Sequence, residues 1–498
     1  MGDTQDLGLI LDSGIPIVAI ESPDERRVLD LLLGLAMKRG LPLKEWTLTR
    51  GLRPGGLDAP TSSDTEFEEP EAMLAHISSQ TGAGIYALCD LHPWFNEPKV
   101  VRYLKDIALE HETRGCVLVL VSHRLTTPPE LSRFTASFKI KLPSDDELMA
   151  IVRKQAQEWA AINKGKRVKT DSETLTKLIA NLRGVTHADA HVLIRHAVFN
   201  DGSITESDIP AINRLKFELL DAEGVLHFEY DTETFSEVAG LHNLKRWLEL
   251  RKTAARQSAT DATNIRKDTD RPRGVMLLGV QGGGKSLAAK CVAGAWGLPL
   301  LRLDFGSLYN KFHGETERNL RNSLEQAELM APCVLWMDEI EKGLATGEGD
   351  NATAQRVLGT LLTWMAENTK PVFIIATSND ISRLPPELVR KGRLDEVFFV
   401  DLPDEEIRQE IFSIHLKKRD ANPDTFDLAK LAAAAEGFTG AEIEEAIVSA
   451  RYMSAAQTNT LTTDSVLSAI NRTFPMSVLR AESIRELRLW AAERTVPA

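Results

Sequence analysis

The residues with the clearest chemical meaning form a glycine-rich run that ends in lysine and serine. Residues 279–286 read GVQGGGKS, the spacing G-x-x-x-x-G-K-S of a phosphate-binding loop. Glycines let backbone N–H groups turn toward phosphate oxygens, Lys285 can reach the β- and γ-phosphates, and the Ser286 hydroxyl can coordinate Mg²⁺. A glycine-rich turn before an ordinary helix is the simpler alternative, but it does not require lysine and serine at these positions. The predicted contacts of a nucleoside triphosphate are Gly279, Val280, Gln281, Gly282, Gly283, Gly284, Lys285, Ser286 and Leu287.

Two neighbouring carboxylates follow the next strongly apolar segment. Residues 331–337, APCVLWM, predict a buried strand, and Asp338 and Glu339 come directly after it. Asp338 can hold Mg²⁺, directly or through water, and Glu339 can act as the base that polarises an attacking water. An Asp–Glu pair after a strand is usually only a solvated turn. Its position downstream of a phosphate loop favours the catalytic interpretation.

Three polar side chains further along the chain could act on the γ-phosphate. Asn379 follows the apolar run 372–377 and could orient the attacking water, although asparagine is also a common turn residue. Arg390 and Arg393 lie three residues apart, after a short predicted helix. Arginine can stabilise charge on a transferring phosphoryl group. Without the preceding motifs, two solvated surface arginines would be the better explanation.

These side chains need a scaffold that brings them to one edge. The apolar run 274–278 leads into the glycine-rich loop, and residues 287–292 continue as a helix-forming run. With the strands expected at 331–337 and 372–377, this alternation predicts a parallel sheet in an α/β domain. Ligands of such sheets bind outside the carboxyl ends of the strands, which is where the loop, the carboxylates and Asn379 would meet.

In this order, the motifs of residues 235–470 resemble those of AAA+ ATPases of the AAA clade. The resemblance implies a P-loop α/β domain with a small helical lid, and ATP and Mg²⁺ as cofactors. It also implies that the two arginines act on the ATP of a neighbouring subunit, in a homo-oligomer that is commonly a hexamer. The catalytic residues that it implies are Lys285, Glu339, Asn379, Arg390 and Arg393, and the further ATP contacts are Ala239, Gly240, His415, Gly440 and Ala441.

A short segment after the phosphate loop bears on what the ATP would be used for. Residues 308–317, LYNKFHGETE, resemble the first pore loop of the AAA clade, with Phe312 at the aromatic position. His313 departs from the hydrophobic neighbour that is usual there. An aromatic ring can grip an extended polypeptide without sequence specificity. By spacing alone, a phenylalanine packed in a helix–loop junction would be the preferred explanation.

The N-terminal half resembles a second, disarmed copy of the same design. Residues 138–147, FKIKLPSDDE, echo 398–406, FFVDLPDEE, and PPEL at 128–131 recurs at 385–388. Where a phosphate loop would lie, this copy has ESPDE, whose three carboxylates would repel phosphate. We interpret Ser22-Pro23-Asp24-Glu25 as a capping box that begins at Ser22. The strand at 85–89 ends in Asp90-Leu91, so the base is expected to be missing and this copy to bind no ATP.

The resulting architecture is α/β, with tandem P-loop (AAA+) modules that each comprise a parallel sheet domain and a small helical lid. The predicted segments are a degenerate α/β domain at 1–143, its helical lid at 144–220, a linker and entry segment at 221–272, the ATPase α/β domain at 273–402, and a helical lid with a C-terminal tail at 403–498. Residues 51–70 are rich in Gly, Pro, Ser, Thr and acidic residues and predict a loop.

Composition narrows the class of protein further. The net charge of −13 argues against nucleic acid as a partner. The four cysteines lie in apolar stretches without metal-ligand spacing, and nothing about them suggests an oxidising compartment. No apolar run approaches membrane-spanning length, and the acidic start of the chain lacks a signal core, so the expected location is the cytoplasm.

The whole chain resembles the bacterial and plastid AAA proteins known as hypothetical chloroplast reading frame forty-six. NRTFPMS at 471–477 and EIEKG at 339–343 carry this narrower resemblance. We expect ATP hydrolysis coupled to the remodelling or translocation of an unknown protein client. The alternative is an ATP-dependent regulator or scaffold whose nucleotide state controls partner binding without threading. A metalloprotease is unsupported, because the sequence has no H-E-x-x-H.

Overall fold

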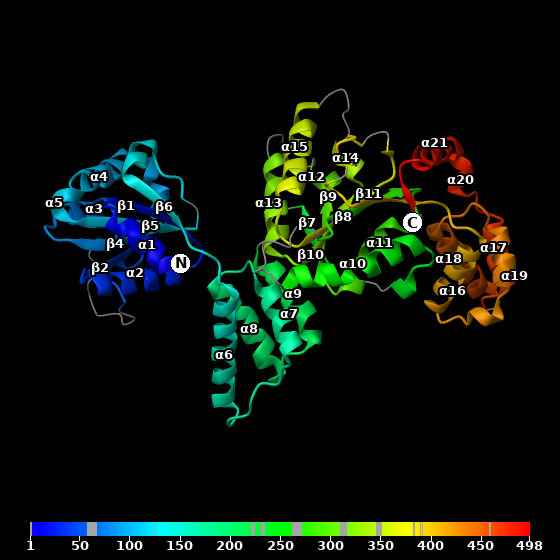
Figure 1. Ribbon diagram of the computed structural model, residues 1–498, viewed down its shortest axis with the longest axis horizontal. Helices are drawn as coiled ribbons and strands as arrows, with labels where there is room; N and C mark the ends of the chain where they lie inside the picture. Colours follow the sequence, from blue (N-terminus) through cyan, green and yellow to red (C-terminus); the bar gives the residue numbers. More distant parts are fainter. Residues whose placement is uncertain are drawn as a thin grey trace. The chain divides into compact units, whose positions relative to one another are not determined.

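The computed structural model describes residues 2–56, 67–123, 125–220, 225–230, 235–260, 271–308, 316–344, 351–381, 384–388, 390, 392–457 and 460–498. It divides into two compact units, which we call unit 1 and unit 2 (Figure 1). Unit 1 comprises Met1–Ile151 and Val185–Val192, and unit 2 comprises Val152–Gly184 and Leu193–Ala498. Within the described part, no helix combines the length and apolarity needed to cross a membrane.

Unit 1 is built on a six-stranded sheet whose order is β3-β2-β4-β5-β1-β6. All neighbouring strands are parallel except β3, which pairs antiparallel with β2. The strands are β1 (Ile17–Glu21), β2 (Leu43–Thr47), β3 (Gly51–Pro54), β4 (Gly84–Cys89), β5 (Cys116–Ser122) and β6 (Thr135–Lys139). The helices of this α/β part are α1 (Asp3–Asp12), α2 (Glu25–Arg39), α3 (Pro70–Ser79), α4 (Pro98–Leu109) and α5 (His111–Arg114).

Unit 2 contains a seven-stranded sheet whose order is β13-β12-β8-β11-β10-β9-β7. Only β7 pairs antiparallel, with β9. The strands are β7 (Leu226–Glu229), β8 (Gly274–Gly279), β9 (Leu300–Asp304), β10 (Cys333–Asp338), β11 (Val372–Ser378), β12 (Glu396–Val400) and β13 (Val496–Pro497). The helices around it are α10 (His242–Thr260), α11 (Lys285–Trp296), α12 (Phe305–Leu308), α13 (Thr316–Leu329), α14 (Ile340–Leu344) and α15 (Asn351–Glu367).

The five central parallel strands of the two sheets have the same order. When these strands are numbered along the chain within each sheet, both sheets read second–third–fourth–first–fifth. The first strand of each sheet, β1 or β8, lies between the fourth and the fifth. The prediction of two P-loop-type α/β modules in tandem is therefore confirmed at the level of topology.

The sheet of unit 2 is buried on both faces, which is why its strands are nearly continuous apolar runs. Along β10, Leu335 and Met337 pack into one hydrophobic cluster, whereas Val334 and Trp336 pack into the other. This alternation follows from the two-residue period of a strand. The first cluster includes apolar residues of α13 and α15, and the second includes those of α10 and α11. The result is a helix–sheet–helix sandwich, with its functional edge at the carboxyl ends of the strands.

Two small helical groups complete the chain (Figure 1). The first follows β6 and comprises α6 (Asp145–Ile162), α7 (Ser172–Leu182), α8 (His187–Asp201) and α9 (Ile209–Leu219). The second follows β12 and comprises α16 (Glu405–Lys417), α17 (Leu428–Ala434), α18 (Gly440–Gln457) and α19 (Thr463–Ile470), after which come α20 (Met476–Leu479) and α21 (Ala481–Ala491). The second group has its own core around Phe412, Ile443 and Ile447.

The loop prediction for residues 51–70 is wrong at both ends of the stretch. Residues 51–54 form β3, in which Leu52 pairs opposite Trp46 of β2, and α3 begins at Pro70. The Trp46 side chain lies in the hydrophobic core of unit 1, and Leu52 packs against the same core. The composition of residues 51–70 does not reveal that part of this stretch pairs with a buried strand. Residues 57–66 lie outside the described residues.

Candidate nucleotide-binding site

The glycine-rich run forms a tight loop between β8 and α11. Gly282 and Gly284 have φ values of +78° and +95°, which side chains with a Cβ rarely adopt. The N–H of Gly283 donates to the Val280 carbonyl at 3.1 Å, which closes the turn. α11 begins at Lys285, so its N-terminal N–H groups face the loop, an arrangement suited to an anion. The strand–loop–helix context predicted from the sequence is present.

Lys285 is the buried cation of this loop. Its Nζ donates to the carbonyls of Gly279 and Val280 at 2.9 and 2.8 Å, and the residue is only 6% exposed. Burial lowers the pKa of Lys285 to about 8, against the opposing effect of three nearby carboxylates. A phosphate at the loop would favour the charged form of the amine, so nucleotide binding and protonation of Lys285 support each other.

Asp338 ends β10 and is held by two donors. Thr377 Oγ1 donates to Asp338 Oδ1 at 2.8 Å, and Arg302 Nη2 donates to Oδ2 at 2.8 Å. The Arg302 guanidinium also lies over the Trp336 ring, at 4.8 Å from its centroid. No sequence pattern indicates this arginine, which reaches Asp338 from the neighbouring strand β9. Asp338 and the exposed Ser286 hydroxyl at the loop offer oxygen ligands, the type that Mg²⁺ prefers, so the donor set fits this ion.

Glu339 lies one residue beyond the strand, in a left-handed backbone conformation with φ +48°. Its N–H donates to Thr377 Oγ1 at 3.1 Å, so the same threonine orients both carboxylate residues. Asn379 Nδ2 donates to Glu339 Oε1 at 3.1 Å, and Lys342 forms an ion pair with Oε2. The structure thus brings the predicted base and the predicted water-orienting amide into direct contact.

Glu341 is a further carboxylate that sequence reasoning missed. It is 5% exposed, and its Oε1 accepts the N–H of Asn379 at 3.0 Å. Its other oxygen, Oε2, has no hydrogen-bond partner among the described residues. The negative charge of Glu341, with those of Asp338 and Glu339, acts to raise the pKa of Lys285 against the effect of burial. The spacing Glu-x-Glu after a strand was the available signal.

A cavity of about 780 Å³ extends from the loop toward the lid. Sequence-predicted residues that line it are Ala239, Gly240, Gln281, Gly282, Gly283, Gly284, Lys285, Ser286, Leu287, Asp338, Glu339, Asn379, His415, Gly440 and Ala441. Gly279 and Val280 do not line the cavity, and their carbonyls accept hydrogen bonds from Lys285 Nζ instead. The site residues therefore converge on one cavity, although which of them contact ATP stays a prediction.

The lid reaches the phosphate loop directly. The N–H of Ala441 approaches the Gly282 carbonyl at 3.4 Å, and Thr439 and Glu442 form a reciprocal cap at the start of α18. His415 of α16 lies beside Glu444, with 3.5 Å between Nδ1 and Oε1, and burial lowers its pKa. A neutral imidazole at this position can contact a nucleoside without adding charge.

The chain's final strand also belongs to this cavity, which the sequence did not predict. β13 is an edge strand and pairs with β12, and Pro497 and Ala498 line the cavity. Asn243 Nδ2 donates to the Pro497 carbonyl at 3.1 Å, and the Ala498 N–H donates to the Phe399 carbonyl at 3.0 Å. Asn243 follows the entry segment Val238–Gly240 closely, so two distant parts of the chain are joined at one wall.

The two predicted arginine fingers do not line this cavity. Arg390 is exposed, and Arg393 donates through Nη1 to the Glu387 carbonyl of its own segment. The two predicted pore residues, Phe312 and His313, lie outside the described residues.

Unit 1 has a matching edge whose chemistry differs. In unit 1, Ile20 of β1 pairs with Phe138 of β6 and with Val121 of β5. In unit 2, Leu277 of β8 pairs with Phe398 of β12 and with Thr377 of β11. The two sheets can therefore be aligned residue by residue. Cys89, opposite Val121, then corresponds to Asp338, and Asp90 corresponds to Glu339. The backbone agrees, because Asp90 and Glu339 both have a left-handed conformation, with φ +53° and +48°. The interpretation that the base is missing is therefore wrong by one position: the absent carboxylate is the metal ligand.

A carboxylate of unit 1 occupies the place of a phosphate loop. α2 begins at Glu25 with Asp24 as its N-cap, so the prediction of Ser22 as the cap is wrong. Ser22 continues the strand instead, since its N–H donates to the Ser122 carbonyl at 2.9 Å. Asp24 accepts the N–H of Arg27 at 3.3 Å through one oxygen and the N–H of Ala188 at 3.3 Å through the other. The side chain thus satisfies two helix N-termini as a phosphate would.

Comparison with known proteins agrees with this geometry. Residues 275–402 match the family "ATPase family associated with various cellular activities (AAA)", 3–140 match the SpoVK-like AAA ATPase N-terminal domain, and 146–223 match the second domain of that group. The AAA domain-containing protein ycf46 of Trieres chinensis is 31% identical over 98% of this chain and 96% of its own length, and that of Guillardia theta is 31% identical over 99% and 95%. The ATP-dependent zinc metalloprotease FtsH 3 of Synechocystis is 34% identical over 48% of this chain and 39% of its own length.

Proposed function

Because this chain belongs to the family of AAA domain-containing proteins called ycf46, and is an AAA ATPase, we propose that it hydrolyses ATP as a homo-oligomeric ring and uses the energy to remodel or translocate a protein client. The observation that carries the ring is the position of Arg390 and Arg393, which lie outside the cavity of their own chain. An arginine that acts in trans needs a neighbouring subunit.

Within the site, each side chain has a distinct proposed task. The loop and Lys285 bind the β- and γ-phosphates, and Ser286 and Asp338 would hold Mg²⁺. When bound, Mg²⁺ would neutralise charge on the phosphate oxygens. Glu339 accepts a proton from the attacking water, and Asn379 keeps the Glu339 carboxylate oriented through its 3.1 Å hydrogen bond.

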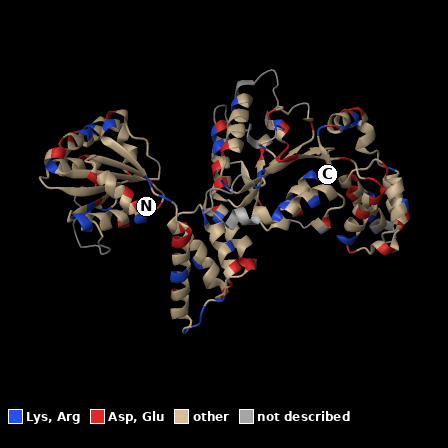
Figure 2. Ribbon diagram, in the orientation of Figure 1, with Lys and Arg blue, Asp and Glu red and all other residues tan. Residues whose placement is uncertain are grey.

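The client is proposed to be protein rather than nucleic acid. Figure 2 supports this choice, because acidic residues are interspersed with basic ones along the helices of both units, rather than separated onto a basic face. The FtsH relative is matched over only 39% of its length, and this sequence has no H-E-x-x-H motif of the kind that binds zinc in metalloproteases. We propose Phe312 as the residue that grips the client polypeptide. We also propose that the protein acts in the cytoplasm.

Mixing two inactive variants tests the ring directly. The Arg390→Ala/Arg393→Ala double variant keeps an intact site but lacks the fingers, whereas Glu339→Gln lacks the base but keeps the fingers. Each alone should hydrolyse ATP slowly, and a mixture should recover activity, because fingers of one chain serve the site of the other. Failure to recover activity at any mixing ratio, with both variants shown to bind ATP, would refute action in trans.

Assembly and client use have separate measurements. With ATP, Glu339→Gln should have a mass by light scattering that is several times the 55.1 kDa of one chain, whereas Lys285→Ala should not. Proteins captured by the ATP-bound Glu339→Gln variant would identify the client. If Phe312→Ala leaves processing of that client intact, the regulator or scaffold function replaces the threading function.

A further inference from the structure

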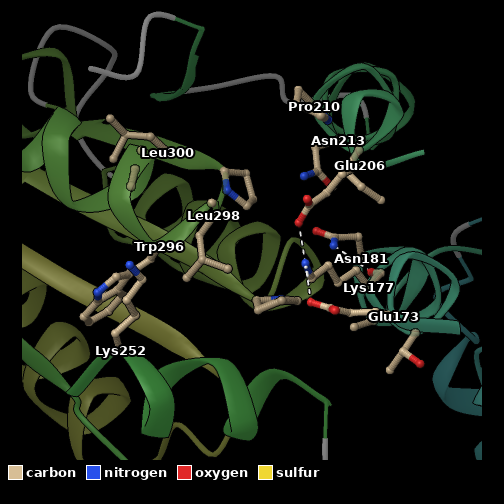
Figure 3. Close-up of a pocket in the computed structure, with 18 of the residues that line it drawn as sticks. Glu173, Lys177, Asn181, Glu206, Pro210, Asn213, Lys252, Trp296, Leu298 and Leu300 are labelled. Carbon is tan, nitrogen blue, oxygen red and sulfur yellow. Dashed lines mark hydrogen bonds and ion pairs between the residues drawn. The ribbon is translucent and has the colours of Figure 1, made fainter. Parts of the chain in front are cut away.

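A second cavity lies in unit 2, away from the nucleotide site. Its volume is about 1010 Å³, and none of its lining residues lines the nucleotide cavity. In Figure 3, Trp296 and Leu298 form one side, and Asn181, Asn213 and Pro210 form the other. The first side is the C-terminal end of α11 and the loop that follows it, and the second side is made by α7 and α9. The cavity therefore lies where the first helical group meets the ATPase domain.

The charged side chains around this cavity are paired with one another. Lys177 forms ion pairs with Glu173, at 2.9 Å, and with Glu206 (Figure 3). Lys252 pairs with Glu249 at 3.5 Å. Since these lysines already have carboxylate partners, the cavity offers a poor site for a phosphate or another anion, which is a clear chemical difference from the nucleotide site.

Two amide side chains with little exposed surface, Asn213 and Asn181, lie among the apolar, polar and charged residues that line the cavity. Asn213 is 4% exposed and lines the cavity, yet its side chain forms no hydrogen bond to any residue that the structure describes. Asn181 is 8% exposed, and its Nδ2 donates to the Lys177 carbonyl at 2.8 Å, which leaves Oδ1 as an acceptor. The side-chain oxygen and nitrogen of Asn213 are not among the buried unpaired atoms of the described residues, so both are accessible from the cavity. A ligand with a complementary donor and acceptor can therefore pair with them.

A buried lysine links the two helices that carry these amides. Lys216 lies three residues after Asn213 on α9, and its Nζ donates to the carbonyls of Asn181 and Arg183 at 2.9 and 2.5 Å. Lys216 is fully buried. This contact ties α9 to the end of α7, so the two helices that carry the amides are held together by a buried cation.

We propose that this cavity binds an uncharged, largely apolar small molecule that carries a ring amide, with its N–H and C=O side by side. Asn213 matches such a group with two parallel hydrogen bonds, one donated by Nδ2 and one accepted by Oδ1. The volume is at the upper end of the range for small-molecule sites. The 12 residues of α11 connect Trp296 to the phosphate loop over about 18 Å, so the bound molecule would contact the far end of the ATP-binding helix.

2-Quinolinone is a suitable probe, because it is uncharged, apolar over most of its surface and carries a ring amide. Calorimetric titration into the full-length protein should give saturable binding, with about tenfold weaker binding of quinoline, which lacks the amide, and none of 2-naphthoate, which is charged. The Lys285→Ala variant should bind 2-quinolinone normally, since the phosphate loop is not involved.

Matched variants locate the binding to this cavity. Asn213→Leu, close to isosteric, should weaken 2-quinolinone binding at least about tenfold, and Thr176→Trp at the exposed mouth should block it without disturbing the core. Asn200→Leu, the same change at an exposed position outside the cavity, should have no effect. The proposal is overturned if 2-quinolinone does not bind, if quinoline binds equally well, or if Thr176→Trp leaves the affinity unchanged.

Discussion

Asn379 and Glu339 are joined by a hydrogen bond of 3.1 Å from the amide Nδ2 to the carboxylate Oε1. The two residues lie forty positions apart and end neighbouring strands, so the parallel sheet alone accounts for their meeting. The contact restrains the carboxylate that we assign as base. If Glu339 is the base, Asn379 should affect the rate through this hydrogen bond.

The first prediction follows from this contact. Asn379→Ala should lower kcat about tenfold or more with little change in ATP affinity, because it frees the Glu339 carboxylate without touching the phosphate loop. In a Glu339→Gln background, already reduced by about 10²–10⁴-fold, the same change should have almost no further effect. Steady-state rates of the two single variants and the double variant measure this. Fully additive losses would mean that Asn379 acts independently of Glu339.

The second prediction concerns stoichiometry. Unit 1 should bind no ATP, because Asp24 fills the phosphate position and Cys89 replaces the metal ligand. Calorimetry on the full-length chain should therefore give one ATP per chain, and Lys285→Ala should abolish all binding. A residual binding event in Lys285→Ala would contradict the assignment of unit 1 as inactive. Asp24→Gly would then show whether that event belongs to unit 1.

The third prediction tests the C-terminal strand as a wall of the nucleotide site. Asn243→Ala removes the hydrogen bond that holds Pro497, worth about 1 kcal/mol, and should weaken ATP binding about fivefold with kcat nearly unchanged. His242→Ala, the neighbouring exposed residue, is the matched control. An unchanged ATP affinity in Asn243→Ala would mean that β13 only closes the sheet edge.

The fourth prediction concerns Lys216 and pH. Burial lowers the pKa of Lys216 to about 7, well below its ordinary value near 10. Between pH 7 and 8.5 the unfolded chain therefore holds a proton that the folded chain has largely lost, so this lysine makes the free energy of unfolding rise with pH. The slope is at most about 1.4 kcal/mol per pH unit.

Denaturant unfolding of Lys216→Met against the wild type at several pH values measures this slope. The free energy of unfolding of the wild type should rise relative to that of Lys216→Met as the pH rises above about 7 toward the ordinary lysine pKa near 10, whereas the exposed Lys154→Met should show no such change relative to the wild type. Above about pH 8.5 the unfolded chain's thiols ionise, and the buried Cys333, whose pKa burial raises to about 12, then opposes the trend. A parallel pH profile for Lys216→Met would show that Lys216 stays charged in the folded protein.

Features with a local signature were predictable from the sequence. The phosphate loop, the two carboxylates and Asn379 each follow an apolar strand, and parallel topology brings strand ends together. Contacts that depend on distant chain segments were not predictable, because no local pattern marks them. Arg302 reaches Asp338 from β9, and Pro497 returns to the site from the far end of the chain.

The errors have equally physical causes. Ser22 has the right residue type for an N-cap, but its backbone is held by the ladder to Ser122, so the helix cannot start before Asp24. The prediction matched Asp90 to Asp338, whereas the structure matches Asp90 to Glu339. This shift of one position arose because an apolar run does not reveal at which residue a strand leaves the sheet. The backbone turn at Asp90, shared with Glu339, defines that point.

The hydrogen bonds of Asp24 have one more consequence. Asp24 belongs to the chain, so its hydrogen bonds with Arg27 and Ala188 form without a bound phosphate. In unit 2 the corresponding approach is between the Ala441 N–H and the Gly282 carbonyl. The link between α8 and the start of α2 in unit 1 is therefore made by the chain itself, with no need of a nucleotide.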